Sequence, residues 1–147
     1  MRLLAVLDTN VLVSALLEPR GLPARLLDQA VDGAFLLALS DYILGELDDV
    51  LGRLGEVEPA TRRDARRLLD RVSRRVRPLS GSWSPRDAKD NPVVGTAVAA
   101  MADYLVTGDR PLLDLGPVSG VEIVSVRKFH RILARRAGGK TLNRHSR

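Results

Sequence analysis

The sequence predicts an α/β protein in three α/β/α layers, with a mostly parallel central sheet of about four to five strands. Two observations support this prediction. Short, nearly continuous apolar runs, typical of strands buried on both faces, alternate with longer segments of helical periodicity. Clusters of turn-forming residues separate these segments, and no internal repeat is visible. Such alternation favours parallel strands that helices connect.

In the first half of the chain, two apolar runs and four helical patterns define the expected elements. The polar cluster Asp8–Asn10 ends the first run, and Glu18–Gly21 interrupts the helical pattern that follows. Ser40 is the expected N-cap of the third helix. The fourth pattern has one apolar stripe and arginines over the rest of its surface, as in an amphipathic basic helix. The expected strands are residues 3–7 and 35–39, and the expected helices are residues 11–17, 22–31, 41–53 and 59–76.

The second half begins with a turn-rich segment, residues 78–91, after which Pro92 stands where the first residue of a helix is expected. The elements expected next are a small-residue helix to residue 102, a strand at 104–106, a short helix to 115, a strand at 121–124 and a terminal helix. We therefore expect one domain over residues 1–137 and a basic, disordered tail over residues 138–147.

The composition fits one globular domain. The chain has 147 residues, of which 45% are hydrophobic, enough for a single buried core. Cysteine is absent, which excludes disulfides, a thiolate nucleophile and cysteine-based metal sites. The first apolar run is shorter than the core of a signal peptide, and no run approaches the roughly 18 residues of a membrane span. These features predict a cytoplasmic protein without a membrane segment.

Charge is divided unevenly along the chain. The net charge is +5, but residues 62–77 carry eight arginines against two acids, and residues 127–147 carry eight basic residues and no acid. The remaining 110 residues carry 7 basic and 16 acidic groups. This pattern predicts an acidic body that binds cations and two basic segments that contact phosphates. Arginines spread over solvated helix faces would explain it equally well.

Asp8 and Asp109 each follow an expected strand directly. Because ligands bind beyond the carboxyl ends of parallel strands, both side chains are expected at one edge of the sheet. Neighbouring carboxylates repel each other unless one is protonated or a cation lies between them. Carboxylates suit hard cations such as Mg²⁺ or Mn²⁺, and the absence of cysteine with only two histidines disfavours zinc.

Two further acids could join this edge. Glu46 lies at the border of the apolar face of the expected helix 41–53, and Asp90 precedes a helix whose N-terminal dipole favours an anion. Taken singly, Glu46 is more typical of a surface residue, and Asp90 is as typical of an ordinary helix cap. The combination of four acids, rather than any one of them, indicates a site.

Four segments together resemble a known family. They are Leu7–Val11, Ser40–Leu47, Arg86–Pro92 and Ala102–Asp109, which read LDTNV, SDYILGEL, RDAKDNP and ADYLVTGD. Over about residues 2–130 the chain resembles the PIN domain family, and most of all the bacterial and archaeal PIN proteins related to the VapC ribonucleases, toxins of toxin–antitoxin pairs. The resemblance implies a metal-dependent endoribonuclease that hydrolyses RNA, a homodimer, and an antitoxin protein as partner.

The resemblance also implies roles for single residues. Asp8, Glu46, Asp90 and Asp109 match the catalytic acids that hold Mg²⁺ or Mn²⁺, and Asp87 could replace or supplement Asp90. Thr9, Asn10 and Thr107 are expected to support the acids, Asn10 by orienting Asp8 or a water on the metal, although Asn10 could equally serve the turn alone. No nucleophilic side chain is needed, since a bound cation can activate water.

Exposed arginines of the basic segment are candidates for contacts with RNA phosphates. We expect them on the helix over residues 59–76, and they are Arg62, Arg66, Arg67, Arg74 and Arg75.

Two other functions compete with the nuclease. The cluster Asp8–Val11 superficially resembles the motif of phosphatases that form an aspartyl phosphate, but Asn10 occupies the position of their second, proton-carrying aspartate. The other alternative is a non-catalytic PIN-like domain that binds RNA or a partner protein, because a fold does not establish activity. The presence of all four acids favours catalysis.

Overall fold

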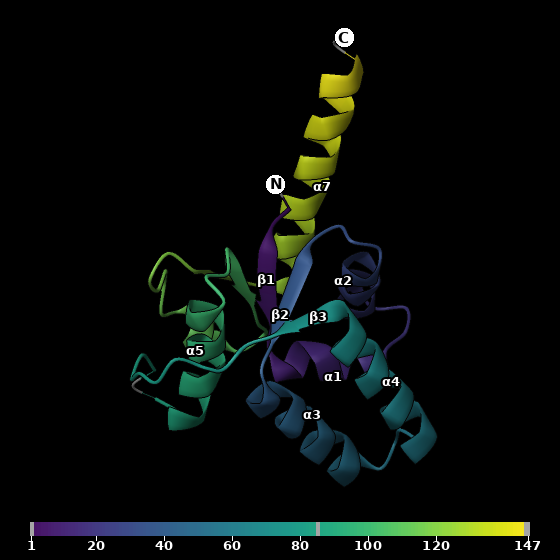
Figure 1. Cartoon of the computed structure of the whole chain (residues 1–147), viewed down its shortest axis with the longest axis vertical. Coiled ribbons are helices and arrows are strands. Elements are labelled where there is room, and N and C mark those ends of the chain that lie inside the picture. Colours follow the sequence, from purple (N-terminus) through teal and green to yellow (C-terminus); the bar gives the residue numbers. More distant parts are fainter. Residues whose placement is uncertain (1, 85, 146–147) are drawn as a thin grey trace.

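A five-stranded parallel sheet forms the centre of the molecule (Figure 1). The computed structural model describes residues 2–84 and 86–145, with side chains up to residue 138. The strands lie in the order β3-β2-β1-β4-β5, and each neighbouring pair is parallel, which confirms the predicted fold class. The strands are β1 (Leu4–Leu7), β2 (Leu36–Leu39), β3 (Ser73–Arg75), β4 (Tyr104–Val106) and β5 (Glu122–Val124).

Helices cover both faces of this sheet. The chain moves from β1 through β2 to β3 in one direction, then continues with β4 and β5 on the other side of β1, so right-handed connections place the two sets of helices on opposite faces. Helix α5 packs against β1, β2 and β4, whereas α1 packs against α2 and α3 (Figure 1). The helices are α1 (Thr9–Leu17), α2 (Leu22–Val31), α3 (Asp41–Leu54), α4 (Pro59–Val72), α5 (Asn91–Ala99), α6 (Arg110–Leu113) and α7 (Val126–His145), and the 3₁₀ turn η1 (Ala88–Asp90) precedes α5.

The strand order creates a switch point between β1 and β4. Strand β1 lies between β2 and β4, and the chain runs from it toward one edge of the sheet before it returns to the other. In open parallel sheets, ligands bind in the crevice beyond the carboxyl ends of the strands at such a point. Asp8 follows β1 directly and Thr107–Asp109 follows β4, so both segments lie at this crevice.

The central strands are buried on both faces, as their apolar sequences predict. Ala5, Val6 and Leu7 of β1 are 0% exposed. Helix α7 is attached to the core by Phe129, whose ring meets that of Phe35 edge-on with centroids 5.0 Å apart. Burial of such large side chains contributes roughly 1.5–3 kcal/mol each. The loops at the carboxyl edge therefore extend from a well-packed support.

One expected helix is too long, and a strand was missed. The pattern over residues 59–76 predicts a single helix, but α4 ends at Val72, and residues 73–75 form β3, which pairs with β2. The Ser73 hydroxyl donates to the Leu69 carbonyl at 2.5 Å, and the Val76 N–H donates to the Leu39 carbonyl at 2.9 Å. Pairing with the exposed edge of β2 outweighs the helical pattern here. The expectation that Arg74 and Arg75 lie on a helix is therefore wrong.

The C-terminal helix also differs from the sequence expectation. Helix α7 continues to His145, past the boundary at residue 137 where we expected a disordered tail to begin, and it extends beyond the rest of the molecule (Figure 1). The division into a domain and a tail stays a prediction. Among the described residues, no helix combines the length and apolar character that crossing a membrane requires.

Candidate active site

A cavity of about 400 Å³ opens at the carboxyl edge of the sheet, between α1, α3 and the start of α5. All four acids that the sequence singled out line it, so the structure brings together residues up to 101 positions apart in the sequence. We call it the acid cavity. Its lining residues are Asp8, Thr9, Asn10, Val13, Ser14, Glu46, Val50, Asp90, Val93 and Asp109.

Asp8 is held by backbone and side-chain contacts as the chain leaves β1. It caps α1, and its own N–H donates to the Val106 carbonyl at 2.9 Å. The carboxylate accepts from the Thr9 N–H and from the Thr107 hydroxyl, both at 2.7 Å. Burial raises the pKa of Asp8, while these two hydrogen bonds oppose the rise. Asp8 thus has one fixed orientation.

Thr9 connects the first acid to the second. Its N–H donates to Asp8, and its hydroxyl donates to Oε1 of Glu46 at 2.8 Å. Glu46 is half-buried on α3, beside the fully packed Leu47. Since Thr9 is only 7% exposed, the bridge between α1 and α3 lies largely out of water.

Thr107 connects Asp8 to Asp109 in a similar way. Its hydroxyl donates to Asp8 and accepts from the Asp109 N–H at 3.0 Å, and Asp109 caps α6 through the Leu112 N–H at 3.3 Å. Asn10 accepts from the Gly108 N–H at 3.4 Å. Asn10 therefore contacts the loop before Asp109, as its alternative role in the turn would allow, while its orienting of Asp8 or of a water on the metal stays a prediction.

Asp90 belongs to the acid cavity, and Asp87 lies outside its lining. Burial, followed by the charges of Asp109, Asp87 and Asp8, raises the pKa of Asp90 to about 6. Asp87 is exposed and caps η1 by accepting from the Lys89 N–H at 2.9 Å. Of the two candidates for this position, the geometry favours Asp90.

Two residues that sequence reasoning did not assign to the site fix the segment around Asp90. The Tyr42 hydroxyl, on α3, donates to the Lys89 carbonyl at 3.0 Å. The Asn91 side chain accepts from the N–H groups of Trp83 and Ser84, each at 2.9 Å. Tyr42 precedes Glu46 by four residues and shares its helix face, which is the signal that could have identified it.

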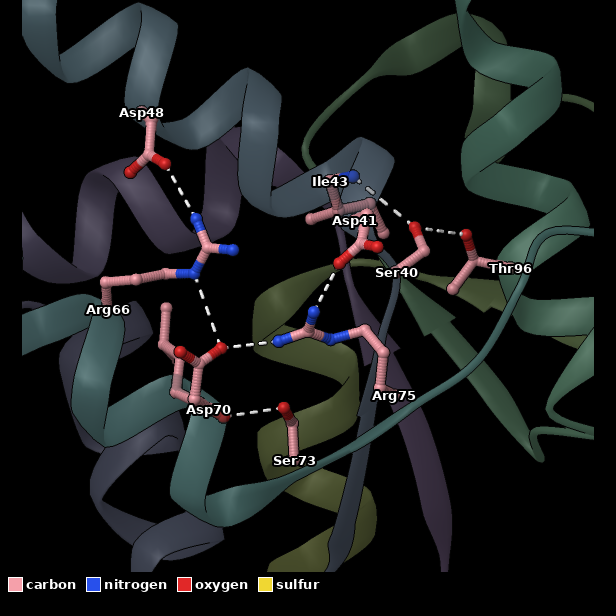
Figure 2. Close-up of polar contacts among 10 residues, drawn as sticks. Ser40, Asp41, Ile43, Asp48, Arg66, Asp70, Ser73, Arg75 and Thr96 are labelled. Atoms are coloured by element: carbon pink, nitrogen blue, oxygen red, sulfur yellow. Dashed lines mark hydrogen bonds and ion pairs between the residues drawn. The ribbon is translucent and has the colours of Figure 1, made fainter.

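A buried hydroxyl pair joins the start of α3 to α5. Ser40 Oγ caps α3 by accepting from the Ile43 N–H at 3.3 Å, and it lies 2.8 Å from Thr96 Oγ1 (Figure 2). Thr96 Oγ1 is also 2.7 Å from the Pro92 carbonyl. Both hydroxyl-bearing residues are 0% exposed. Helix α3, which carries Glu46, is therefore linked to helix α5, which begins directly after Asp90.

The four acids suit a hard divalent cation by their chemistry. They supply only oxygen ligands, and none of the ion pairs in the described part of the chain involves them. A cation would offset the burial and the repulsion that together raise the pKa of Asp90. Within residues 2–84 and 86–145, no three acidic or histidine side chains are already arranged as a metal site.

The family model of the PIN domain matches residues 4–111, which include all four acids and the strand that precedes Asp109. The chain belongs to the PIN domain family. Members of this family are typically nucleases, so the coarse functional class is that of a hydrolase.

Individual relatives of this PIN domain agree with the assignment. The uncharacterized protein MJ1680 of Methanocaldococcus jannaschii is 28% identical over 124 residues, which cover 78% of this chain and 76% of the relative. The crystal structure of PAE2754 from Pyrobaculum aerophilum has a TM-score of 0.63 and 21% identity, with 90% of each chain covered. The structure of VapBC2 from Rickettsia felis, bound to a DNA fragment from its promoter, has a TM-score of 0.55 and 14% identity, covering 83% of this chain and 98% of that one. At these identities the two structures show the fold alone.

The candidate RNA-binding arginines of this PIN domain differ in whether they form ion pairs with acidic side chains. Arg66 pairs with Asp48 at 2.7 Å and with Asp70 at 3.3 Å, and Arg75 pairs with Asp70 and Asp41 (Figure 2). This network ties α3, α4 and β3 together, so Arg66 and Arg75 have a structural role. The other three candidates lie apart from it: Arg62 is half-buried, Arg67 is exposed and lies 3.9 Å from Asp64, and Arg74 is exposed on β3.

Proposed function

We propose that this PIN domain is a ribonuclease that hydrolyses RNA phosphodiester bonds with Mg²⁺ or Mn²⁺. The observation that carries the proposal is the convergence of four acids on one cavity at the switch point of the sheet. A protein that only bound RNA would gain nothing from four carboxylates, because they repel phosphates.

The four acids, and the two threonines that hydrogen-bond to them, each have a role in this proposal. Asp8, Glu46 and Asp90 would hold the ion, with Asp109 beside them. Bound there, a divalent cation supplies activation of water and neutralisation of charge on the phosphoryl oxygens. Thr107 and the Thr9 N–H keep the Asp8 carboxylate oriented, and the Thr9 hydroxyl does the same for Glu46.

The same proposal makes this chain the toxin of a toxin–antitoxin pair, with an antitoxin protein as partner and a homodimer as its own assembly. Its support is the likeness of fold to the VapBC2 complex of Rickettsia felis. Expression in a bacterial host should arrest growth, and Asp8→Asn should remove the arrest.

Cleavage of an end-labelled RNA pool tests the proposal. The purified protein should cut RNA with Mg²⁺ or Mn²⁺ and not with EDTA, while Asp8→Asn and Glu46→Gln should reduce the rate by at least about a hundredfold. Asp28→Asn, which neutralises an exposed acid on α2, is the matched control and should cut like the parent. Circular dichroism would establish that each variant is folded.

The outcomes separate the alternatives. Cutting that persists in EDTA, or in both site variants, would exclude the carboxylate mechanism. A parent that binds RNA without cutting it under any metal would favour the non-catalytic binding domain instead.

A further inference from the structure

A second cavity, of about 370 Å³, lies between α3 and α4. We call it the arginine pocket. Asp48, which lines it, is on the opposite flank of α3 from Glu46 and Val50, which line the acid cavity. One helix, about 10–12 Å across with its side chains, therefore separates the two cavities. The residues that line the arginine pocket are Asp48, Pro59, Arg62, Arg63, Arg66 and Arg67.

The pocket has a surplus of positive charge that the protein does not neutralise. Its lining has four arginines and one acid, and that acid is paired with Arg66. Arg67 lies 3.9 Å from Asp64, where both side chains are more than three-quarters exposed, so water screens this pair. Arg62 and Arg63 make no ion pair with any described residue.

Arg62 has an unmet hydrogen-bonding group at this position. Its Nε is buried and has no hydrogen-bond partner among the described residues. The guanidinium also packs over Gly52, where an added Cβ would lie 3.2 Å from Nη1. A buried donor without an acceptor costs free energy, and a charged acceptor that supplied the missing bond would recover it. Arg62 therefore lines the pocket with one donor group that no described residue satisfies.

We propose that the arginine pocket binds a backbone phosphate of the RNA strand, a few nucleotides from the bond that is cut. This assignment rests on the proposed ribonuclease function. Planar guanidinium groups bind phosphate oxygens in a fork, and the pocket lies one helix away from the acids. Since the acid cavity repels the strand, a phosphate site beside it offsets that repulsion and sets which bond reaches the acids.

Fluorescence anisotropy with a labelled, unstructured single-stranded RNA in EDTA tests this site without any cleavage. The double variant Arg62→Gln/Arg63→Gln should bind at least about fivefold more weakly, and the slope of log K against log salt should fall by about 0.7 for each phosphate that the variant no longer binds. Arg20→Gln/Arg25→Gln removes the same charge from exposed positions before and on α2 and is the control. Arg63→Gln alone, at an exposed position, should lower affinity without any effect on folding.

Three results would overturn the assignment. The first is an equal fall in affinity in the two double variants, which would mean a general charge effect. The second is unchanged binding in the pocket variant. The third is displacement of the RNA by polyglutamate at a lower concentration of charge than by unlabelled RNA, which would indicate an acidic protein partner.

Hydrolysis of bis(p-nitrophenyl) phosphate with Mn²⁺ separates this assignment from the proposed function. This substrate carries a single phosphate, so it cannot place one phosphate at the acids and another in the arginine pocket, and the pocket variant should hydrolyse it at the parent's rate. Failure of the parent to hydrolyse both this substrate and RNA would refute the nuclease, whereas the anisotropy result would still decide whether the pocket binds phosphate.

Discussion

Replacing Gly95 by alanine tests the packing that places α5, and with it Asp90, against the segment before it. A Cβ at this position would lie 2.2 Å from the carbonyl oxygen of Leu79, and within 3.3 Å of the Leu79 nitrogen. The Leu79 N–H also donates to the Gly95 carbonyl at 3.0 Å, so the two backbones are in direct contact. To restore an ordinary contact of 3.4 Å, one backbone must move by about 1.2 Å.

The expected magnitude is the difference between two opposing effects. Alanine in place of glycine within a helix stabilises by up to about 1 kcal/mol, while forcing atoms into a packed region costs about 1–3 kcal/mol. Because backbone rather than a flexible side chain must yield, we expect a net loss of about 1–2 kcal/mol and a fall in Tm of roughly 2–8 °C. Gly45, on α3, is the control because an added Cβ there meets nothing within 4 Å, and its replacement should stabilise by about 0.5–1 kcal/mol.

Urea denaturation and thermal unfolding in EDTA measure both effects. The reasoning is refuted if Gly95→Ala is as stable as the parent, or if both alanine variants gain the same stability. Titration with Mn²⁺ should also show weaker binding to Gly95→Ala, since Asp90 is the last residue of η1 and directly precedes the displaced helix. Unchanged Mn²⁺ affinity in a destabilised variant would mean that α5 does not set the position of that acid.

Single side chains give three further predictions. Asp90→Asn should stabilise the metal-free protein at pH 8 by about 1 kcal/mol after solvent screening is allowed for, because the folded pKa of about 6 lies above the ordinary value of 3.8 and the charged form is disfavoured. The gain should disappear as the pH falls below 3.8, where Asp90 is protonated in both states. Tyr42→Phe removes the hydrogen bond to Lys89 and should weaken Mn²⁺ binding by about fivefold with little change in Tm. Phe129→Ala should cost about 3–5 kcal/mol in urea denaturation, since its ring is 0% exposed and contacts Phe35.

Each of these predictions has a contradicting result. A stability difference between Asp90→Asn and the parent that does not depend on pH would exclude burial and repulsion of the charged carboxylate as the cause. Equal Mn²⁺ affinity in Tyr42→Phe would show that its hydroxyl does not position the turn. A destabilisation below about 1 kcal/mol for Phe129→Ala would mean that α7 contributes little to the fold.

The sequence was sufficient to predict the positions of the site residues that directly follow strands. Asp8 and Asp109 could be placed together because each follows an apolar strand, and parallel strands end at one edge. Glu46 could be placed from its position beside an apolar helix face. The helix pattern over residues 59–76 failed because nothing local distinguishes residues 73–75 from the helix before them. Residues 73–75 form a strand because they pair with the open edge of β2, whose residues are distant in the sequence.

The arginines show a second limit of prediction from local sequence patterns. Their number predicts a basic surface, but their sequence positions do not say which are neutralised. Arg66 and Arg75 are paired with acids from other elements, whereas Arg62 and Arg63 form no ion pair with a described residue. The distinction depends on the packing of α4 against α3, which brings Asp48 to Arg66 and leaves Arg62 over Gly52.

The negative charges of the acid cavity lower the stability of the folded protein. Four carboxylates with no ion-pair partner among the described residues destabilise the folded chain, as the raised pKa of Asp90 indicates. The bridges from Thr9 and Thr107, and the buried link between Ser40 and Thr96, hold the elements that carry these charges in place. A cation that binds only the folded state would add stability in proportion to the logarithm of its concentration. The burial and repulsion that disfavour these charges in the metal-free protein would therefore favour binding of a cation, and replacing the acids should lower cation affinity while raising stability.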